Sequence, residues 1–384
     1  MSARRKVLFI SSWFPNRLHP LDGNFVQRHA EAVNTLHDVE ILHVVPDPQQ
    51  QQMYQIEDKT VNGIHTVIVY YKDAGNPIIN NVRKFSAYKK GYRLIKKPDI
   101  IHANVLHTNI LFALWLKKKY GISYVVTEHF TDYRPINLKN LSPVQKNVAR
   151  LTGNNASSIF PVTDDLKKGL NELGITAPMK VVPNVVDTTV FRPQNHVRED
   201  SEFVFLHISN LVSRKNPDKI VEAATELMKE GLNIRLLIGG DASETDAQLL
   251  KQQIKNSGFH NRIEFFGMLT SPEVAAKMNE AGCFILFSED ENQPCVISES
   301  FSAGIPVISS DVGGISEFFP ENFGVLIEER SVENLKSAMR KAINNRLFAT
   351  GEELSAYAEN NFSVASIAKQ YSESYLQILN EKLR

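Results

Sequence analysis

The stretch Glu291-Asn-Gln-Pro-Cys-Val-Ile-Ser-Glu299 is the part of the sequence that decides the fold class. It lies between two short apolar runs, Cys283–Phe287 and Pro306–Ser309, so the expected order is strand, acidic loop, helix, turn and strand. Pro294 suits the first turn of that helix, because its missing N–H would be unpaired there anyway. Free N–H groups at a helix start attract phosphate, and a carboxylate inside the helix can hold vicinal hydroxyls. The combination predicts a site for a nucleotide sugar.

Similar apolar runs recur along the whole chain, with helical stretches between them. Continuous apolar runs are typical of buried parallel strands, and their alternation with helices favours doubly wound sheets. A chain of 384 residues is too long for one ordinary core. We therefore expect an α/β protein with two Rossmann-like domains, joined by the polar stretch Phe191–Asp200. The predicted strands are Val7–Ile10, Val39–Val45, His65–Tyr71, Ile100–His102, Tyr124–Thr127, Ser158–Val162 and Lys180–Val182 in the first half, and Phe203–Ile208, Ile234–Ile238, Ile263–Phe266, Cys283–Phe287, Pro306–Ser309 and Gly324–Ile327 in the second.

The composition is that of a soluble globular protein, with 42% hydrophobic and 22% charged residues. Only two cysteines occur, Cys283 and Cys295, which favours a reducing compartment over a disulfide framework. No apolar run is long enough to span a bilayer. We interpret the apolar residues near Met1 as a buried first strand instead of a signal peptide. The sequence thus predicts a cytoplasmic protein.

The zero net charge hides a difference between the two halves of the chain. Residues 1–190 hold 24 Lys and Arg against 15 Asp and Glu, whereas residues 191–384 hold 19 against 28. The basic excess fits a solvated helix face, and it also fits peripheral contact of the N-terminal domain with the anionic inner face of the cell membrane. Nucleic acid is not an expected partner, because the chain is neutral overall and carries no recognised binding motif. Much of the excess sits at Arg83, Lys84, Lys89, Lys90, Arg93, Lys96 and Lys97.

Two carboxylates eight positions apart, Glu291 and Glu299, are followed by Ser300-Phe-Ser-Ala-Gly-Ile-Pro-Val-Ile-Ser-Ser-Asp-Val-Gly-Gly-Ile-Ser-Glu317. This pattern resembles the E-x7-E signature of the retaining glycosyltransferases of family 4. The resemblance implies the GT-B fold, in which two Rossmann-like domains face a central cleft. It assigns residues 1–192, with a returning helix at 363–384, to an acceptor-binding domain, and residues 200–362 to a donor-binding domain.

The resemblance also implies an activity. A hexosyl group would pass from a nucleoside diphosphate sugar, with UDP-sugar favoured, to a hydroxyl of a glycan, a lipid-linked glycan or a small molecule. The expected setting is polysaccharide, glycolipid or related glycan biosynthesis. Retention in this family is attributed to front-face attack with the leaving phosphate as base, so neither a cofactor nor a metal ion is expected. Two other classes stay open, namely an epimerase or other GT-B enzyme and a nonenzymatic sugar-binding protein.

The resemblance places the donor in the second half of the chain. Glu299 would accept hydrogen bonds from the ribose hydroxyls, and Glu291 would lie at the donor sugar and the reacting side of the phosphate. Amides near Cys295 and Val296 would hold phosphate. Residues 292–294 replace the glycines of the usual motif, so the contacts to the donor sugar are expected to differ from those of the family.

Four further residues of the second half are candidates to bind the donor, three of them at positions that carry over from the family. Lys215 matches a lysine that neutralises the diphosphate and stabilises the leaving group. Asn210 stands where the family usually has an arginine, so a bidentate phosphate donor is missing. Arg214 is a candidate to compensate for that loss. Main-chain groups of Met268, which follows a Phe-Gly pair, would read the base.

The first half of the chain offers fewer matches. Gly23 precedes a helix and looks like the glycine loop that approaches donor and acceptor. His129 ends a strand and matches a histidine that hydrogen-bonds the donor sugar, and Asn184 would line the cleft. His102 and His107 also lie near a strand end, and for His107 a structural role is the expectation. The expected catalytic residues are His129, Lys215 and Glu291.

Overall fold

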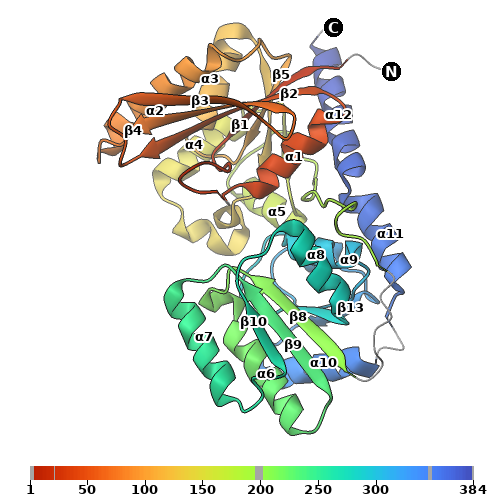
Figure 1. Cartoon of the computed structure of the whole chain (residues 1–384). Coiled ribbons are helices and arrows are strands. Elements are labelled where there is room, and N and C mark those ends of the chain that lie inside the picture. Colours follow the sequence, from red (N-terminus) through yellow and green to blue (C-terminus); the bar gives the residue numbers. More distant parts are fainter. Residues whose placement is uncertain (1–3, 21, 195–201, 345–347, 383–384) are drawn as a thin grey trace. The chain divides into compact units, whose positions relative to one another are not determined.

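The structure is a computed structural model that describes residues 4–20, 22–194, 202–344 and 348–382. The chain forms two compact units, which we call unit 1 and unit 2 (Figure 1). Unit 1 comprises Met1–Val185 and Val364–Arg384, and unit 2 comprises Val186–Ser363. Within the stretch predicted as a linker, Phe191 is buried in the core of unit 2, and residues 195–200 lie outside the described part of the chain.

Unit 1 is built on a seven-stranded sheet with the order β3-β4-β2-β1-β5-β6-β7. All neighbouring strands are parallel except β3 and β4. The central strands are almost wholly buried, as expected where helices cover both faces of a sheet. The strands are β1 (Lys6–Ser11), β2 (Asp38–Asp47), β3 (Tyr54–Val61), β4 (Ile64–Lys72), β5 (Ile100–Asn104), β6 (Ser123–Glu128) and β7 (Ser158–Pro161).

The strand β3 was missing from the sequence prediction. It lies at the sheet edge and pairs only with β4, so most of its residues are exposed and polar and it lacks the apolar run of a buried strand. A turn at Asn62 and Gly63 joins the two strands, with φ values of 47° and 78°. Positive φ at both central residues is the mark of a type I′ turn, for which Asn-Gly is a strong sequence signal. The sequence signal for this hairpin was therefore the Asn62-Gly63 pair of its turn, and not an apolar run.

The predicted strand at Lys180–Val182 is wrong. Its neighbour Met179 forms a single parallel bridge with Ile159 in β7. The N–H groups of Lys180 and Val182 also donate to the carbonyls of Ile159 and Pro161, both at 3.1 Å. Because proline has no N–H, Pro161 cannot donate back to this segment, so the pairing is incomplete and no strand forms.

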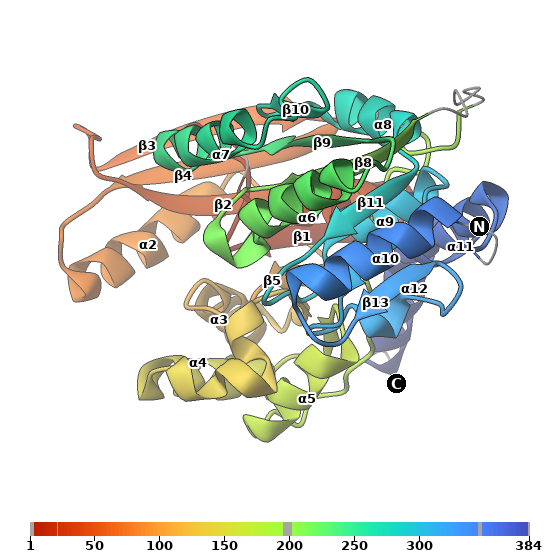
Figure 2. The ribbon, with the colours of Figure 1, turned by 90° about the horizontal axis from the view of Figure 1, so that it is seen from below.

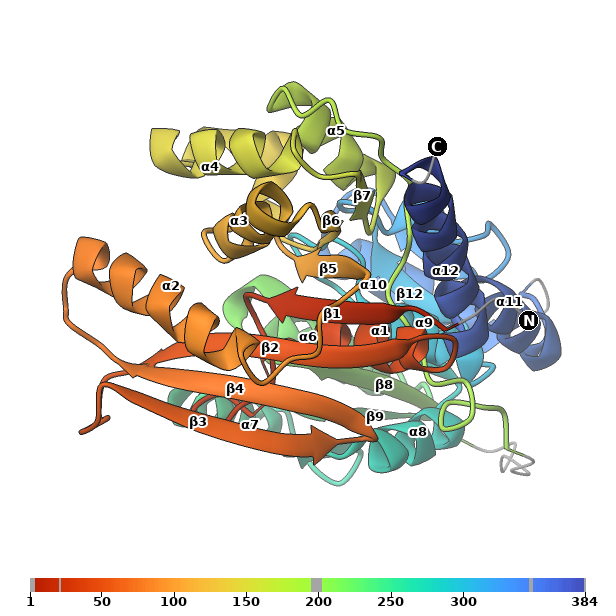
Figure 3. The ribbon, with the colours of Figure 1, turned by 90° about the horizontal axis from the view of Figure 1, so that it is seen from above.

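Helices cover both faces of the unit 1 sheet. Four of them, α2 to α5, pack on one face and share a core with it (Figure 3). The other face is covered by α1 together with α12, the last helix of the chain. The helices are α1 (Asn24–Asn34), α2 (Pro77–Tyr92), α3 (Ile110–Tyr120), α4 (Pro143–Gly153), α5 (Asp164–Glu172) and α12 (Val364–Glu381), with short 3-10 helices η1 (Thr131–Tyr133) and η2 (Pro135–Asn140).

A buried polar network ties α12 to the sheet of unit 1. The hydroxyl of Tyr375 is hydrogen-bonded to His102 Nδ1, and His102 Nε2 lies 2.6 Å from the hydroxyl of Thr127. The hydroxyl of Tyr371 lies 3.0 Å from that of Thr127 and 3.1 Å from His29 Nδ1 in α1. Both tyrosine rings are fully buried. The last helix is thus part of the core of unit 1, where Figure 1 shows it beside α1.

Unit 2 has a six-stranded sheet with the order β10-β9-β8-β11-β12-β13, and all its neighbouring strands are parallel. All six apolar runs predicted in the second half are strands. They are β8 (Phe203–Ser209), β9 (Ile234–Gly240), β10 (Ile263–Phe266), β11 (Cys283–Leu286), β12 (Val307–Ser310) and β13 (Gly324–Ile327).

The helices of unit 2 form a layer on each face of its sheet. One core contains residues of α6, α7 and α10 (Figure 2), and the other contains residues of α8, α9 and α11. Two of these helices begin with reciprocal capping boxes, at Thr270 with Glu273 and at Thr350 with Glu353. The helices are α6 (Pro217–Lys229), α7 (Glu244–Asn256), α8 (Ser271–Glu280), α9 (Cys295–Ser302), α10 (Val332–Asn344) and α11 (Gly351–Phe362), with short 3-10 helices η3 (Ser213–Lys215) and η4 (Ser316–Phe318).

Candidate functional site

The loops that follow β8 and β11 bring a lysine and a glutamate together in unit 2. These strands are neighbours in the sheet, so their carboxyl ends are adjacent. Lys215 ends η3, and its ammonium forms an ion pair with the carboxylate of Glu291. The hydroxyl of Ser288 donates to Oε1 of the same carboxylate at 2.7 Å. The two charged side chains are only 12% and 10% exposed, so water screens their interaction weakly.

Further hydrogen bonds fix the backbone around this ion pair. Asn216 has left-handed backbone (φ 49°), and its side chain donates to the carbonyl of the residue after β11 at 2.9 Å. The N–H of Glu289 donates to the carbonyl of Arg214 at 2.8 Å. The hydroxyl of Ser310 donates to the carbonyl of Ser288 at 2.6 Å. The loops after β8, β11 and β12 are therefore joined, and the ion pair is held by a preorganised backbone.

The helix α9 starts four residues after Glu291. Pro294 is its N-cap residue, and the proline side chain offers no group to cap the helix. Cys295 and Val296 follow in the first turn and are half-buried. Glu299 lies one turn further along and is 5% exposed. A helix start attracts phosphate, and a buried carboxylate accepts hydrogen bonds from paired hydroxyls, so this helix suits both parts of a nucleotide.

The remaining predicted donor residues of unit 2 also follow strand ends. Asn210 and Arg214 come after β8 and are exposed. Met268 comes after β10 and is 59% exposed. All predicted donor residues of unit 2 thus lie beyond the carboxyl ends of β8, β10 or β11, the edge at which open parallel sheets bind ligands.

In unit 1, the start of α1 and the end of β6 lie together. Gly23 is the N-cap of α1 with φ 69°, and a Cβ atom there would lie 2.3 Å from the carbonyl oxygen of Trp13. Only glycine fits this position, because any side chain would clash with the backbone. His129 directly follows β6, and its ring centroid lies 4.5 Å from that of Phe25 in α1. The predicted residues Gly23 and His129 therefore belong to one neighbourhood.

His129 is a neutral imidazole at physiological pH. Burial lowers its pKa well below the usual value, and the nearby imidazoles of His29 and His102 act in the same direction. A hydrogen bond with the side chain of Asn184 opposes this shift. A neutral imidazole can donate or accept a hydrogen bond without carrying charge. The structure thus brings together His129 and Asn184, both of which are predicted site residues.

A buried carboxylate that the sequence analysis missed is Glu128, the last residue of β6. Its Oε1 accepts the N–H groups of His129 (2.8 Å) and Phe130 (2.7 Å), and its Oε2 accepts the N–H of Leu106 at 2.6 Å. Burial raises the pKa of Glu128 to about 7, although these three N–H groups favour the charged form. This carboxylate fixes the loops after β5 and β6. The available signal was a carboxylate at the end of a buried strand.

The stability of the protein should depend on pH through Glu128. The pKa of the folded form, about 7, lies above the ordinary 4.5, so between these values the folded protein keeps a proton that the unfolded chain has released. The contribution of Glu128 to stability therefore falls as pH rises through this window, by about 3 kcal/mol, whereas the buried histidines contribute in the opposite direction because burial lowers their pKa. Glu128→Gln removes only the contribution of Glu128. The change in unfolding free energy from pH 5 to pH 8, measured by urea unfolding, should therefore be more favourable to the fold in this variant than in the wild type, and Glu172→Gln, at an exposed site in α5, should change like the wild type. Equal changes in all three proteins would contradict the prediction.

His102 and His107, the other two histidines near a predicted strand end, differ in their surroundings. His102 lies inside β5 and is fully buried in the network with Tyr375, so its role is structural. His107 lines a cavity of about 190 Å³ in unit 1. This cavity, which we call the lysine pocket, is lined by Ser12, Trp13, Val44, Val45, Pro46, Lys84, Val105, His107, Asn109 and Phe130.

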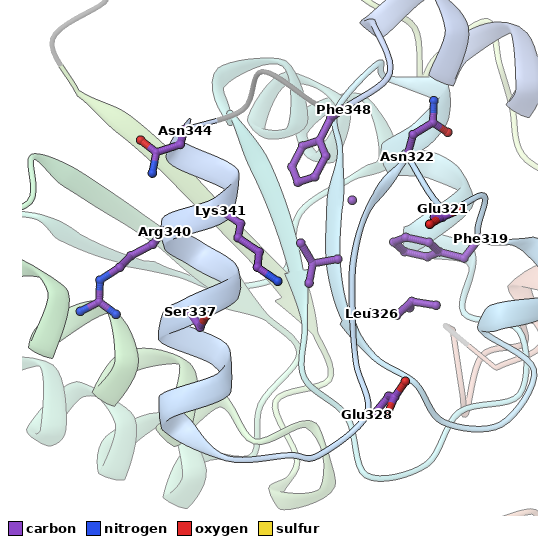
Figure 4. Close-up of a pocket in the computed structure, with 12 residues that line it drawn as sticks. Phe319, Glu321, Asn322, Leu326, Glu328, Ser337, Arg340, Lys341, Asn344 and Phe348 are labelled. Atoms are coloured by element: carbon purple, nitrogen blue, oxygen red, sulfur yellow. The ribbon is translucent and has the colours of Figure 1, made fainter.

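A larger hollow of about 1200 Å³ lies in unit 2, against the edge strand β13 and the helix α10 (Figure 4). Lys341 points toward it, whereas Arg340 points away and pairs with Glu230. No residue predicted to bind the donor is among those that line this hollow. Among the described residues, no group of three His, Cys, Asp or Glu could hold a metal ion. In the same parts of the chain, no helix combines the length and apolar character needed to cross a membrane.

Comparison with known sequences agrees with this geometry. Residues 190–362 match the family "Glycosyl transferases group 1", and residues 23–190 match "Glycosyltransferase Family 4". The chain is 29% identical over 197 residues to a phosphatidylinositol N-acetylglucosaminyltransferase polypeptide from Arabidopsis thaliana, a match that covers 50% of this chain and 43% of that protein. It is 26% identical over 296 residues to the N-acetyl-alpha-D-glucosaminyl L-malate synthase of Bacillus anthracis, which covers 74% of this chain and 76% of that one. The chain thus spans less than half the length of the first of these relatives.

Comparison with solved structures shows the fold. A sucrose-phosphate synthase from Thermosynechococcus elongatus superposes with a TM-score of 0.79 at 17% identity, covering 98% of this chain and 100% of that chain. An Anabaena protein solved in complex with UDP superposes with a TM-score of 0.75 at 18% identity, covering 97% and 100%. The two family matches adjoin and together extend over residues 23–362. The chain belongs to the group 1 glycosyl transferases of glycosyltransferase family 4, and it has the GT-B fold.

Proposed function

We propose that this protein is a retaining hexosyltransferase that moves a sugar from a UDP-sugar to a hydroxyl group of a glycan, a lipid-linked glycan or a small molecule. The observation that carries the proposal is the largely buried ion pair of Lys215 and Glu291 at the carboxyl edge of the unit 2 sheet. A largely buried lysine paired with a glutamate four residues before the start of a helix is an arrangement suited to a diphosphate.

The ion pair also balances the two charges of the site. Glu291 neutralises Lys215, which limits the cost of burying either charge. A diphosphate that enters at the start of α9 competes for the ammonium and releases Glu291. The freed carboxylate then accepts hydrogen bonds from hydroxyls of the donor sugar, and Ser288 keeps it in place.

The proposed reaction needs no nucleophile from the protein. The acceptor oxygen forms a bond to the anomeric carbon on the face from which the diphosphate departs. The bond between that carbon and the phosphate oxygen breaks, and the acceptor proton passes to the leaving phosphate. Lys215 stabilises the negative charge that develops on the leaving group, and His129 positions the sugar through a hydrogen bond. In this mechanism, the protein contributes the positioning of the reactants and the stabilisation of charge.

A UDP-sugar is the favoured donor because a protein with the same fold, from Anabaena, was solved with UDP. Buried Glu299 would accept hydrogen bonds from the ribose hydroxyls, and main-chain groups of the exposed residue Met268 would contact the base. The membrane contact belongs to the proposal as well. The first turns of α2 expose Ile78 (76%) and Val82 (64%) on one helical stripe, with lysines further along the helix, as in helices that lie on anionic membranes. Sedimentation with anionic lipid vesicles tests this part.

Calorimetric titration with UDP tests the donor site. Glu299→Ala removes an acceptor of two charge-assisted hydrogen bonds, so the affinity for UDP should fall by at least about tenfold. Glu329→Ala removes an exposed carboxylate elsewhere in unit 2 and should bind UDP like the wild type. If Glu299→Ala also binds UDP like the wild type, the assignment of the site fails.

A panel of UDP-sugars, followed by mass spectrometry, tests the reaction itself. Release of UDP together with a glycosylated acceptor supports the transferase. Conversion of the donor without any acceptor would identify an epimerase instead. Binding of free sugars with no turnover of any UDP-sugar would identify a nonenzymatic sugar-binding protein.

A further inference from the structure

The lysine pocket of unit 1 has an unbalanced positive charge. Its ten lining residues include one lysine and no carboxylate. The ammonium of Lys84, on α2, donates to the hydroxyl of Thr108 at 3.1 Å and takes part in no ion pair among the described residues. The side chain is partly buried, and this burial lowers the pKa of Lys84. A charge that has lost part of its hydration and has no counter-ion is costly to keep, unless a ligand supplies one.

The same end of the pocket carries a second source of positive potential. Thr108, which holds the ammonium, lies two residues before the first residue of α3. Asn109 is the N-cap of this helix, and its side chain does not cap it. The positive end of the helix dipole and the ammonium of Lys84 therefore act at one place, and both favour an anion there.

Neutral hydrogen-bonding groups complete the lining. The hydroxyl oxygen of Ser12 is buried and has no partner among the described residues. Burial, and then the charge of Lys84, lower the pKa of His107, so its imidazole is neutral. The rings of Trp13 and Phe130, whose centroids lie 5.6 Å apart, add an apolar part to the lining. The pocket thus has a charged end, polar groups and an aromatic wall, which together suit a small polar organic anion.

We propose that the lysine pocket binds an anionic group, a phosphate or a carboxylate, that the acceptor carries near the hydroxyl that receives the sugar. This inference rests on the proposed transferase function and narrows the class of its acceptor. Lys84 forms the ion pair with the anion. Ser12 and His107 form hydrogen bonds with the anion or with adjoining hydroxyls, and Trp13 contacts the carbon skeleton. At about 190 Å³, the cavity takes a small head group, since pockets for drug-sized ligands measure roughly 300–1,000 Å³.

Calorimetry with three compounds of one carbon skeleton tests the inference on the full chain. Glycerol is neutral, glycerate carries a carboxylate, and glycerol 3-phosphate carries a phosphate. The wild type should bind one or both anions and show no measurable binding of glycerol. Lys84→Met should weaken anion binding by at least about tenfold, because it removes a charged hydrogen-bond donor while keeping the length of the side chain. Lys84→Arg should restore most of the affinity. Lys90→Met, on the exposed face of the same helix, should bind like the wild type.

Vesicle sedimentation separates the two sources of such an anion. The protein is mixed with phosphatidylcholine vesicles with and without phosphatidate. Binding to phosphatidate that depends on Lys84 identifies a lipid head group, and binding of glycerol 3-phosphate alone identifies a soluble acceptor. Either result supports an anion site in the lysine pocket. If the Lys84→Met variant sediments with phosphatidate vesicles like the wild type, the vesicle contact is made by other residues of α2 and the lipid head group is not the ligand of the pocket.

The inference is overturned if glycerol binds as well as its anionic relatives, or if Lys84→Met binds the anions like the wild type. UDP is titrated into the same preparations to keep this failure distinct from failure of the proposed function. If the wild type binds UDP but does not prefer the anionic compounds, only the inference about the lysine pocket fails. If the wild type does not bind UDP, the transferase proposal fails.

Discussion

Replacing Lys215 with methionine is expected to lower kcat/KM for sugar transfer by about 10²- to 10³-fold, the range found when a preorganised group that stabilises developing charge is removed. Methionine keeps the length of the side chain and loses the ammonium. The variant also leaves Glu291 without its cation, so its carboxylate repels the incoming diphosphate. We therefore expect both a lower kcat and a weaker affinity for UDP.

Steady-state kinetics with a saturating acceptor separates the two effects of Lys215→Met. Lys229→Met, an exposed lysine at the end of α6, is the matched control and should keep wild-type kinetics. The variant Lys215→Met with Glu291→Gln should recover part of the UDP affinity, because the second change removes the unpaired carboxylate. A Lys215→Met protein with wild-type turnover would show that the ion pair is only structural.

Replacing Tyr375 with alanine is expected to destabilise unit 1 by about 3–5 kcal/mol, the cost typical of removing a buried aromatic side chain. The ring is fully buried among residues of α12 and the sheet, and its hydroxyl bonds to His102. Tyr375→Phe keeps the ring and loses only that hydrogen bond, so about 1 kcal/mol is expected. Glu373→Ala changes an exposed residue of the same helix and should have little effect.

Tryptophan fluorescence during urea unfolding measures this effect on unit 1 selectively. The chain has two tryptophans, Trp13 and Trp115, and both belong to unit 1. The midpoint of the fluorescence transition should move to lower urea for Tyr375→Ala, while the affinity for UDP at low temperature stays unchanged. An unchanged midpoint would show that α12 contributes little to the stability of unit 1.

The strands of both sheets could be predicted where burial on two faces leaves a continuous apolar run. This holds for β8 to β13 and for most of unit 1. It fails for β3, since this exposed edge strand has no such run, and at Lys180–Val182, where the missing N–H of Pro161 on the neighbouring strand leaves the pairing incomplete. A continuous apolar run indicates burial on both faces, and β3 shows neither such a run nor the strict alternation of a half-buried strand.

The site was predictable only in part, and for a different reason. Lys215 and Glu291 are 76 positions apart in the sequence, and only the resemblance to a family placed both at the donor. Glu128 and Lys84 belong to no motif. Their importance comes from what the fold packs around them, namely three N–H groups around one carboxylate and the start of α3 beside one ammonium. Such environments arise from tertiary structure, so single-sequence patterns do not contain them.

The position of α12 has a consequence for how the chain is made. Unit 2 is continuous in sequence, whereas unit 1 is completed by Val364–Arg384. At roughly 5–20 residues per second, a ribosome needs about 10–40 s to synthesise the intervening residues. During that interval the nascent first unit exposes the apolar face of α1 that Tyr371 and Tyr375 later cover. Unit 2, although synthesised second, can therefore complete its fold before unit 1. Until α12 is made, a chaperone that binds apolar surface can protect the exposed face of α1.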